Sequence, residues 1–179
     1  MVIRPNKSIG LLGGSFDPAH KGHLSISKIA LKKIKLKKIF WLVTRKNPFK
    51  KKPFYSLSYR INEARKMVKY EKKIKVIYLD KNTGSSRSIN VINYLINKKK
   101  LKDLYLIIGA DNLLRFHKWK NWKKIVKLTK LVVFSRKGYD KKGRKSIVAK
   151  HLKNKIIFIN NKPISISSTK LRNQIKNNN

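Results

Sequence analysis

Residues 13–24, GGSFDPAHKGHL, decide the fold, because they join a short apolar run to a segment with helical spacing. The apolar run, residues 8–12, predicts a buried strand, and residues 26–34 repeat an apolar side chain every fourth residue, as in a helix. Between them, Gly13 and Gly14 predict a tight turn where the backbone can approach a ligand closely. A strand, a glycine turn and a helix start form an anion site, since free N–H groups and the positive end of the helix dipole point at the ligand.

Two histidines follow the predicted turn. His20 and His23 are three residues apart, so a helix that begins near Ala19 places both imidazoles on one face of its first turn. There they can donate hydrogen bonds to phosphate oxygens, and we interpret the stretch as a cradle for a nucleoside triphosphate. Its spacing differs from Gly-x-x-x-x-Gly-Lys-Ser/Thr and from Gly-x-Gly-x-x-Gly, which excludes two other phosphate motifs. An ordinary turn with structural histidines is the alternative.

Composition bounds the class of protein. The chain has 179 residues, 41% of them hydrophobic, and no cysteine. Its length suits one domain, residues 1–179, with a substantial core. The lack of cysteine excludes disulfides and thiolate chemistry and fits a reducing compartment. Residues 1–8 lack the apolar core of a signal peptide, and no apolar run reaches membrane-spanning length. We therefore expect a soluble cytoplasmic protein.

The charge is extreme, since 47 Lys and Arg against 7 Asp and Glu give a formal net charge of +40. Such a charge favours nucleic-acid partners. The lysines are nevertheless spread over almost every segment, opposite the apolar stripes, and the chain is also rich in Ile and Asn. This distribution indicates compositional bias. We expect non-specific attraction of polyanions at low salt only, with a basic nucleic-acid-binding domain as the alternative from another functional class.

Strands and helices are expected to alternate along the rest of the chain. Further strands are predicted at residues 38–44, with Trp41 in the core, and at 74–79, 104–108, 131–135 and 156–159. Helices are predicted at 57–70, with Ser56 as N-cap, at 88–97 and 121–128, and from Ser168 onward, with a polar loop at 80–88. This alternation predicts an α/β fold, a Rossmann-like, doubly wound parallel sheet with ligands above the carboxyl ends of its strands.

Polar residues gather where these strands end. Thr44, Asn47 and Lys50 follow the second strand. Gly109 and Asp111 follow the fourth, where ribose hydroxyls need an acceptor. We therefore expect these two loops to converge on one crevice with the loops after the first and the last strands.

The last helix opens with small polar residues. Ser167, Ser168 and Thr169 stand at its start, and Arg172 follows one turn later. Ordinary N-capping explains them, and the rim of a phosphate or adenine site explains them too. Both interpretations can hold together.

Two of these stretches carry a family resemblance. Residues 13–24, GGSFDPAHKGHL, and residues 166–172, ISSTKLR, resemble the two signature motifs of nucleotidyltransferases with a His-x-Gly-His motif, and more narrowly those of bacterial nicotinate-nucleotide adenylyltransferases. Residues 107–119, IIGADNLLRFHKW, resemble that family's segment around the pyridine pocket. The resemblance implies transfer of AMP from ATP to nicotinate mononucleotide, with nicotinate adenine dinucleotide and pyrophosphate as products. A sibling enzyme with another acceptor, such as nicotinamide mononucleotide, is the alternative within this class.

The resemblance also implies roles for individual residues. Trp119 would stack on the nicotinate ring, for which helix packing is the alternative, and N–H groups near Lys120 and in the Ser88–Ile89 turn would hold its carboxylate. The family's Thr-x-Asp/Gln-Thr-Leu pattern is replaced here by SINVI at residues 88–92. Mg²⁺ would accompany ATP and bridge its phosphates. The expected catalytic residues are His20, His23, Arg172 and Lys50. The expected ATP-binding residues are Gly13, Gly14, Ser15, Phe16, His20, Gly22, His23, Gly109, Asp111, Ser167, Ser168, Thr169 and Arg172. The expected residues for nicotinate mononucleotide are Thr44, Asn47, Ser88, Ile89, Asp111, Trp119 and Lys120.

Overall fold

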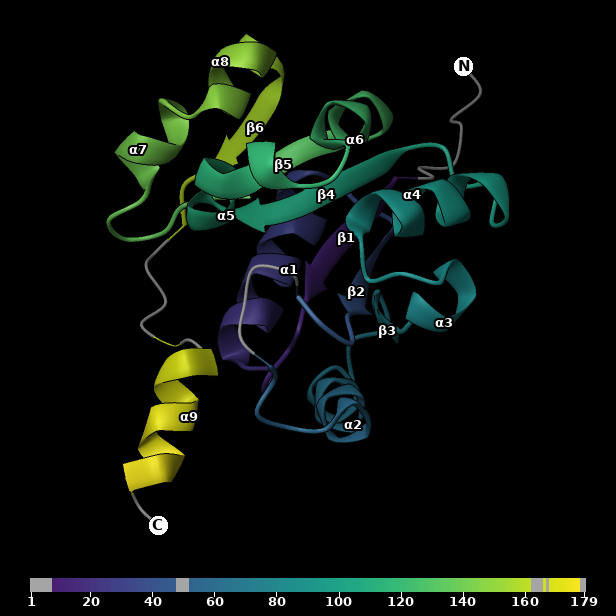
Figure 1. Cartoon of the computed structure of the whole chain (residues 1–179), viewed down its shortest axis with the longest axis vertical. Coiled ribbons are helices and arrows are strands. Elements are labelled where there is room, and N and C mark those ends of the chain that lie inside the picture. Colours follow the sequence, from purple (N-terminus) through teal and green to yellow (C-terminus); the bar gives the residue numbers. More distant parts are fainter. Residues whose placement is uncertain (1–7, 48–51, 162–165, 167, 178–179) are drawn as a thin grey trace.

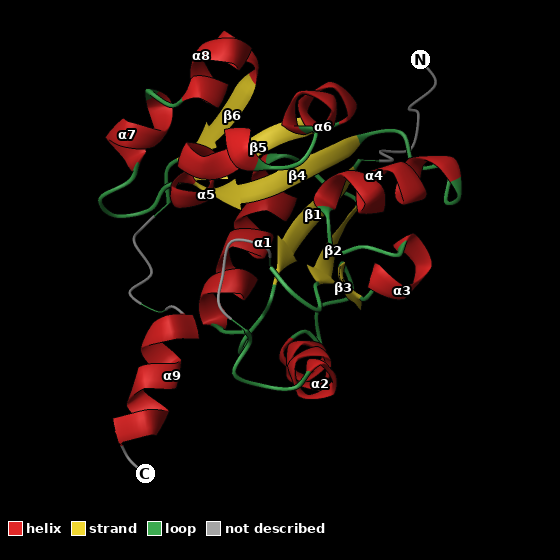
Figure 2. Ribbon diagram, in the orientation of Figure 1, coloured by secondary structure: helices red, strands yellow, loops and turns green. Residues whose placement is uncertain are grey.

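A computed structural model describes residues 8–47, 52–161, 166 and 168–177 (Figure 1). Six strands form one sheet in the order β3-β2-β1-β4-β5-β6, and all neighbouring strands are parallel (Figure 2). The strands are β1 (Ile9–Gly14), β2 (Lys38–Val43), β3 (Ile74–Ile77), β4 (Leu104–Gly109), β5 (Lys130–Phe134) and β6 (Ile156–Ile159). The chain winds outward from β1 and then restarts beside it at β4. This order confirms the predicted doubly wound sheet and puts its switch point between β1 and β4, where such sheets bind ligands.

Helices cover both faces of the sheet. They are α1 (Lys21–Lys33), α2 (Leu57–Met67), α3 (Asp80–Thr83), α4 (Ser88–Asn97), α5 (Ala110–Arg115), α6 (Trp122–Leu128), α7 (Asp140–Arg144), α8 (Ile147–Leu152) and α9 (Ser168–Asn177), with short 3-10 turns η1 (Phe116–Lys118) and η2 (Lys153–Lys155). Among the described residues, no helix is long and apolar enough to cross a membrane.

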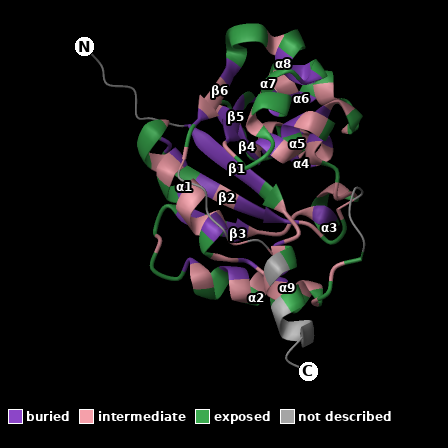
Figure 3. Ribbon diagram, turned by 90° about the vertical axis from the view of Figure 1, so that its left-hand side faces the viewer, coloured by how far each residue is buried: buried purple, intermediate pink, exposed green. Residues whose placement is uncertain are grey.

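Two apolar clusters, one on each side of the sheet, hold these layers together. Leu11 belongs to the cluster under α4, α5, α6 and α8, whereas Leu12 belongs to the cluster under α1 and α2. The same alternation occurs at Val132 and Val133 in β5, since successive strand residues point to opposite faces. Figure 3 shows the central strands largely buried between the helices. Trp41 is fully buried, as predicted.

The glycine turn expected after β1 is wrong in its position. Gly13 and Gly14 are the last two residues of β1 and pair in register with Leu42 and Val43 of β2. Neither has positive φ; the left-handed residue is instead Phe16, with φ 47°. A Cβ on Gly13 would meet no atom within 4 Å. The lack of a side chain at Gly13 therefore leaves open space at the end of the strand and does not serve a turn.

Helix boundaries differ from the predictions where packing decides them. Helix α1 begins at Lys21, not near Ala19, because His20 is an extended N-cap with φ −151° and ψ 167°. Helix α2 ends at Met67, and its predicted N-cap is confirmed, since Ser56 Oγ accepts from Tyr59 N at 3.2 Å. The structure has short helices at 110–118, 140–144 and 147–152 that were not predicted. Helix α3 occupies part of the expected loop at 80–88.

Candidate active site

The two predicted histidines meet at the N-terminus of α1. The ring centroids of His20 and His23 are 3.9 Å apart, with 39° between their planes. His20 Nδ1 accepts from Gly22 N at 3.1 Å, and His23 Nδ1 accepts from His20 N at 3.2 Å. A nitrogen that accepts an N–H bond carries no proton, so each neutral ring carries its proton on Nε2. The reciprocal cap therefore presents two Nε2–H donors at a helix N-terminus, where anions are favoured.

Aromatic packing holds the His23 ring in place. Phe16, 1% exposed, lies with its ring centroid 4.7 Å from that of His23 and stacks on Trp41 at 5.0 Å. Trp41 Nε1 donates to Ser27 Oγ at 2.8 Å, and Ser27 Oγ donates to the carbonyl of His23 at 2.8 Å. The Phe16 side chain is thus part of the support under the imidazole, and only the backbone of Phe16 can face a ligand.

The C-terminal motif docks on the loop after β1. Ser168 Oγ donates to Pro18 O at 2.9 Å, and Arg172 Nη1 donates to the carbonyl of Asp17 at 2.5 Å and to its Oδ2 at 3.4 Å. Arg172 Nη2 also donates to Thr169 Oγ1 at 3.2 Å. Two motifs about 150 residues apart in sequence therefore lie together, at the end of the sheet to which the β1 arrow points (Figure 1). Ser167 and Lys50 lie outside the described residues.

Asp17 is the centre of this docking. Asp17 is 4% exposed, and its two carboxylate oxygens accept from Tyr55 N and Phe54 N, each at 2.9 Å. The loop after β1, the segment before α2 and Arg172 of α9 are thus fastened by one carboxylate.

The loop after β2 is tied to the same place. Thr44 N donates to Gly14 O at 3.0 Å, and Arg45 N donates to Asp80 Oδ2 at 2.7 Å. Thr44 and Asn47 are both half-buried. The loops after β1 and β2 therefore converge, as predicted.

Asp111 stands at the start of α5, directly after β4. Its Oδ2 accepts from Arg136 Nη1 at 3.1 Å, while its buried Oδ1 has no hydrogen-bond partner within the described part of the chain. A Cβ on Gly109 would lie 2.5 Å from that Oδ1, so a larger residue at this position would require the carboxylate to shift. Asp111 therefore retains an acceptor at the switch-point edge.

The residues expected around the pyridine ring differ in what they offer. Trp119 is half-buried against the core, with its ring centroid 4.8 Å from that of Phe116, so packing accounts for much of its contact. Ile89 is 2% exposed and can contribute only its backbone, whereas Ser88 is the first residue of α4. Lys120 is exposed.

The chain resembles known proteins over most of its length. The cytidylyltransferase-like family model matches residues 11–174, which span both histidines and Arg172. A probable nicotinate-nucleotide adenylyltransferase from Pelagibacter ubique is 48% identical over 165 residues, covering 92% of this chain and 91% of its own length. The chain belongs to the nicotinate-nucleotide adenylyltransferase family. A family relative from Clostridium novyi is 36% identical, over 96% of this chain and 88% of its own length.

Solved structures agree on the fold of this nicotinate-nucleotide adenylyltransferase family member. Plasmodium falciparum nicotinic acid mononucleotide adenylyltransferase complexed with NaAD superimposes with a TM-score of 0.75 at 20% identity, over 94% of this chain and 83% of that one. The same enzyme complexed with APC gives a TM-score of 0.73 at 19% identity.

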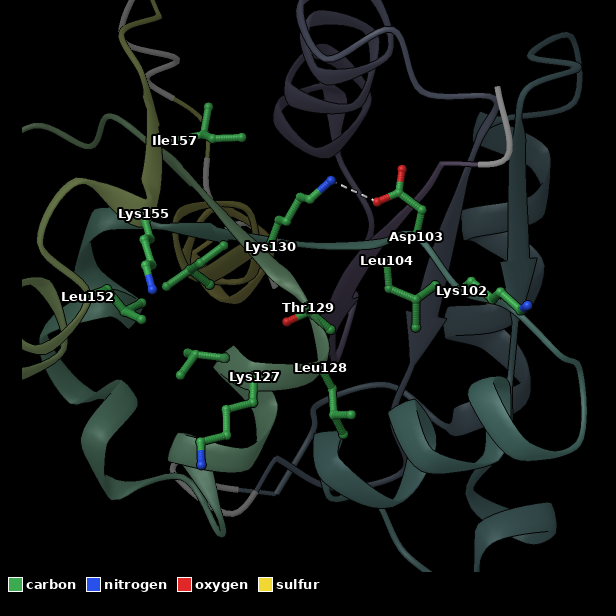
Figure 4. Close-up of a pocket in the computed structure, with 12 residues that line it drawn as sticks. Lys102, Asp103, Leu104, Lys127, Leu128, Thr129, Lys130, Leu152, Lys155 and Ile157 are labelled. Atoms are coloured by element: carbon green, nitrogen blue, oxygen red, sulfur yellow. Dashed lines mark hydrogen bonds and ion pairs between the residues drawn. The ribbon is translucent and has the colours of Figure 1, made fainter. Parts of the chain in front are cut away.

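A hollow of about 520 Å³ lies at the opposite edge of the sheet from the family motifs, at the amino ends of β4, β5 and β6 (Figure 4). Four of its 12 lining residues are lysines: Lys102, Lys127, Lys130 and Lys155. Lys130 Nζ forms an ion pair with Asp103 Oδ1 at 2.9 Å. With 47 Lys and Arg among 179 residues, about three cations in any such dozen are expected from composition alone. This hollow carries no mark of a site.

Three buried charged residues of this family member were missed by the sequence reasoning: Asp17, Arg60 and Asp80, which are 4%, 2% and 9% exposed. The scarcity of acids, of which the chain has 7, is the one signal for Asp17 and Asp80, and Arg60 has no such signal among 47 Lys and Arg. Arg136, the partner of Asp111, was also missed, although it follows β5 where a ligand-facing residue is expected.

Proposed function

We propose that the chain, acting as one nucleotidyltransferase domain, transfers AMP from ATP to nicotinate mononucleotide and releases pyrophosphate. The observation that carries this proposal is the reciprocal histidine cap, which presents two Nε2–H donors at the start of α1 in a member of this family. A relative that is 48% identical bears the name probable nicotinate-nucleotide adenylyltransferase.

The reaction we infer is a single in-line displacement. A phosphate oxygen of the mononucleotide attacks the α-phosphorus of ATP, the new P–O bond forms, and the bond to the pyrophosphate oxygen breaks. His20 and His23 would donate from Nε2 to the phosphate oxygens on which negative charge grows, and the backbone of Gly13, Gly14, Ser15 and Gly22 would approach the triphosphate. Such positioning with electrostatic stabilisation is the main source of rate in phosphoryl-type transfers.

The departing pyrophosphate needs cations. We assign this role to Arg172 and Lys50, with Ser167, Ser168 and Thr169 at the rim of the ATP site. Arg172 already donates to the Asp17 carbonyl and Thr169, and its guanidinium has five N–H donors in all, so it can hold a phosphate oxygen without leaving the loop.

Mg²⁺ is the divalent ion we propose, carried by ATP. Mg²⁺ usually keeps several waters and binds through substrate phosphates with one or two carboxylates, and within the described residues no group of three or more His, Cys, Asp or Glu is placed to hold a metal ion. When bound, it would neutralise phosphate charge.

The acceptor would lie across the switch point. Asp111, whose buried Oδ1 beside Gly109 has no hydrogen-bond partner among the described residues, would accept from ribose hydroxyls. Thr44 and Asn47 would line the mononucleotide from the β2 side. Trp119 would face the pyridine ring, while N–H groups of Ser88, Ile89 and Lys120 would hold the carboxylate.

Pyrophosphate release from ATP tests the proposal, measured with nicotinate mononucleotide, with nicotinamide mononucleotide and with no acceptor. We expect release to depend on an acceptor and to be fastest with the nicotinate form. Release with nicotinamide mononucleotide but not with the nicotinate form would favour an enzyme that uses the amide as its acceptor. If release does not depend on either acceptor, adenylyl transfer is rejected.

A further inference from the structure

Arg60 lies in the second turn of α2 and points into the protein with 2% exposure. All of its hydrogen bonds given by the structure go to backbone carbonyls. Nη1 donates to Ser15 O at 2.5 Å and to Thr44 O at 2.8 Å, Nη2 donates to Arg45 O at 3.2 Å, and Nε donates to Tyr55 O at 3.2 Å.

These carbonyls belong to the loop after β1, the loop after β2 and the segment before α2. A planar guanidinium offers donors in several fixed directions, which a lysine ammonium cannot reproduce from one point. The carboxylate of Asp80 also holds the second loop, since its Oδ2 accepts from Arg45 N at 2.7 Å. One side chain therefore fixes the distance between the two loops that we assign to ATP and to its acceptor.

The contact chain from Arg60 to the histidines is short. Ser15 precedes Phe16, whose backbone is left-handed with φ 47°. The Phe16 ring in turn lies 4.7 Å from the His23 ring. Holding the Ser15 carbonyl thus fixes the residue on which the imidazole rests.

We propose that Arg60 is a positioning residue, which aligns the histidine cap after β1 with the acceptor loop after β2 for the displacement. Burying a guanidinium is costly unless its donors are satisfied, and burial lowers the pKa of Arg60 while the carboxylates of Asp17 and Asp80 offset part of that effect. A chain that needed only a filled core could place an apolar residue here at no such cost.

The variant Arg60→Lys tests this, with Arg65→Lys, an exposed residue of the same helix, as the matched control. Because misalignment by about 1 Å costs roughly 100-fold in rate, we expect kcat per folded molecule to fall about 10- to 100-fold. Each substrate binds mainly to its own loop, so both KM values should stay within about threefold. A residue that serves stability alone would lower the melting temperature and leave kcat of the folded fraction unchanged.

The kinetic measurement rests on the proposed function, so a second readout is independent of it. The chain has 4 histidines, and side-chain nitrogen NMR reports the tautomer of each. Arg60→Lys should shift the resonances of His20 and His23 and leave those of His117 and His151 unchanged. If the wild-type chain transfers no AMP, the proposed function fails, while these spectra still decide the role of Arg60.

Arg60→Gln, which is neutral and keeps one amide donor group, serves if the lysine variant does not fold. Wild-type kcat, or unchanged His20 and His23 resonances in a folded variant, would overturn the proposal. Failure of both variants to fold would assign Arg60 to folding alone and overturn it equally.

Discussion

Replacing His23 by alanine should lower turnover far more than stability. The substitution removes one Nε2–H donor at the position of developing phosphate charge, and loss of one such contact typically costs about 10²–10³ in rate, or roughly 2.7–4 kcal/mol. It also removes the acceptor for His20 N, at 3.2 Å, and one helix-cap bond contributes about 1 kcal/mol. For a domain of this size that equals a fall of about 2–4 °C in melting temperature.

The assay is steady-state formation of nicotinate adenine dinucleotide at 25 °C, well below the transition, with thermal unfolding followed in parallel. His151→Ala is the control, since this histidine is exposed and its ring meets that of Trp122 edge-on, with centroids 5.1 Å apart. His23→Gln separates the two effects, because glutamine at this helix position can accept the same N–H bond; it should recover the melting temperature more fully than the rate. A folded His23→Ala protein with turnover within about threefold of wild type would refute the role given to His23.

Three further results are expected. Gly109→Ala should destabilise the protein by about 1–3 kcal/mol in chemical unfolding, because the new Cβ would lie 2.5 Å from Asp111 Oδ1; an unchanged midpoint would show that the carboxylate moves freely. Nicotinate mononucleotide should be preferred to its amide by at least about tenfold in kcat/KM, since an unpaired buried amide donor costs about 1–3 kcal/mol, and equal efficiency would reject a pocket of N–H donors. Binding of random-sequence DNA, followed by fluorescence anisotropy, should weaken about 10³- to 10⁵-fold between 50 and 200 mM salt if roughly six to ten phosphates are contacted. Tight, sequence-selective binding at 200 mM salt would contradict purely non-specific attraction.

The sequence was sufficient for features set by local pattern. All six strands were placed within two residues of their ends, because parallel strands buried on both faces are continuous apolar runs. The pairing of His20 with His23 follows from their spacing of three, and the Ser56 cap follows from its side chain. The motif at residues 166–172 was rightly expected near the loop after β1, since ligands in such sheets bind where several strands end.

Features set by contacts between residues far apart in the chain could not be predicted from the sequence. Gly13 and Gly14 predict a turn in the sequence, but their pairing with β2 extends β1 through both residues. Helix α7 is stabilised by packing that no local pattern reveals, with Gly143 close against the Ala110 carbonyl of α5. Arg60 looks like any basic residue on a helix, and only carbonyls 5 to 45 positions away in sequence explain its burial.

The central claim is one direct transfer of AMP at the paired histidines, and the fate of the α-phosphate of ATP tests it most directly. ATP chiral at its α-phosphorus by sulfur substitution should give, with nicotinate mononucleotide, a dinucleotide that carries the labelled phosphorus with inverted configuration. Retained configuration would show a covalent enzyme intermediate. Absence of the label from any dinucleotide would contradict adenylyl transfer itself.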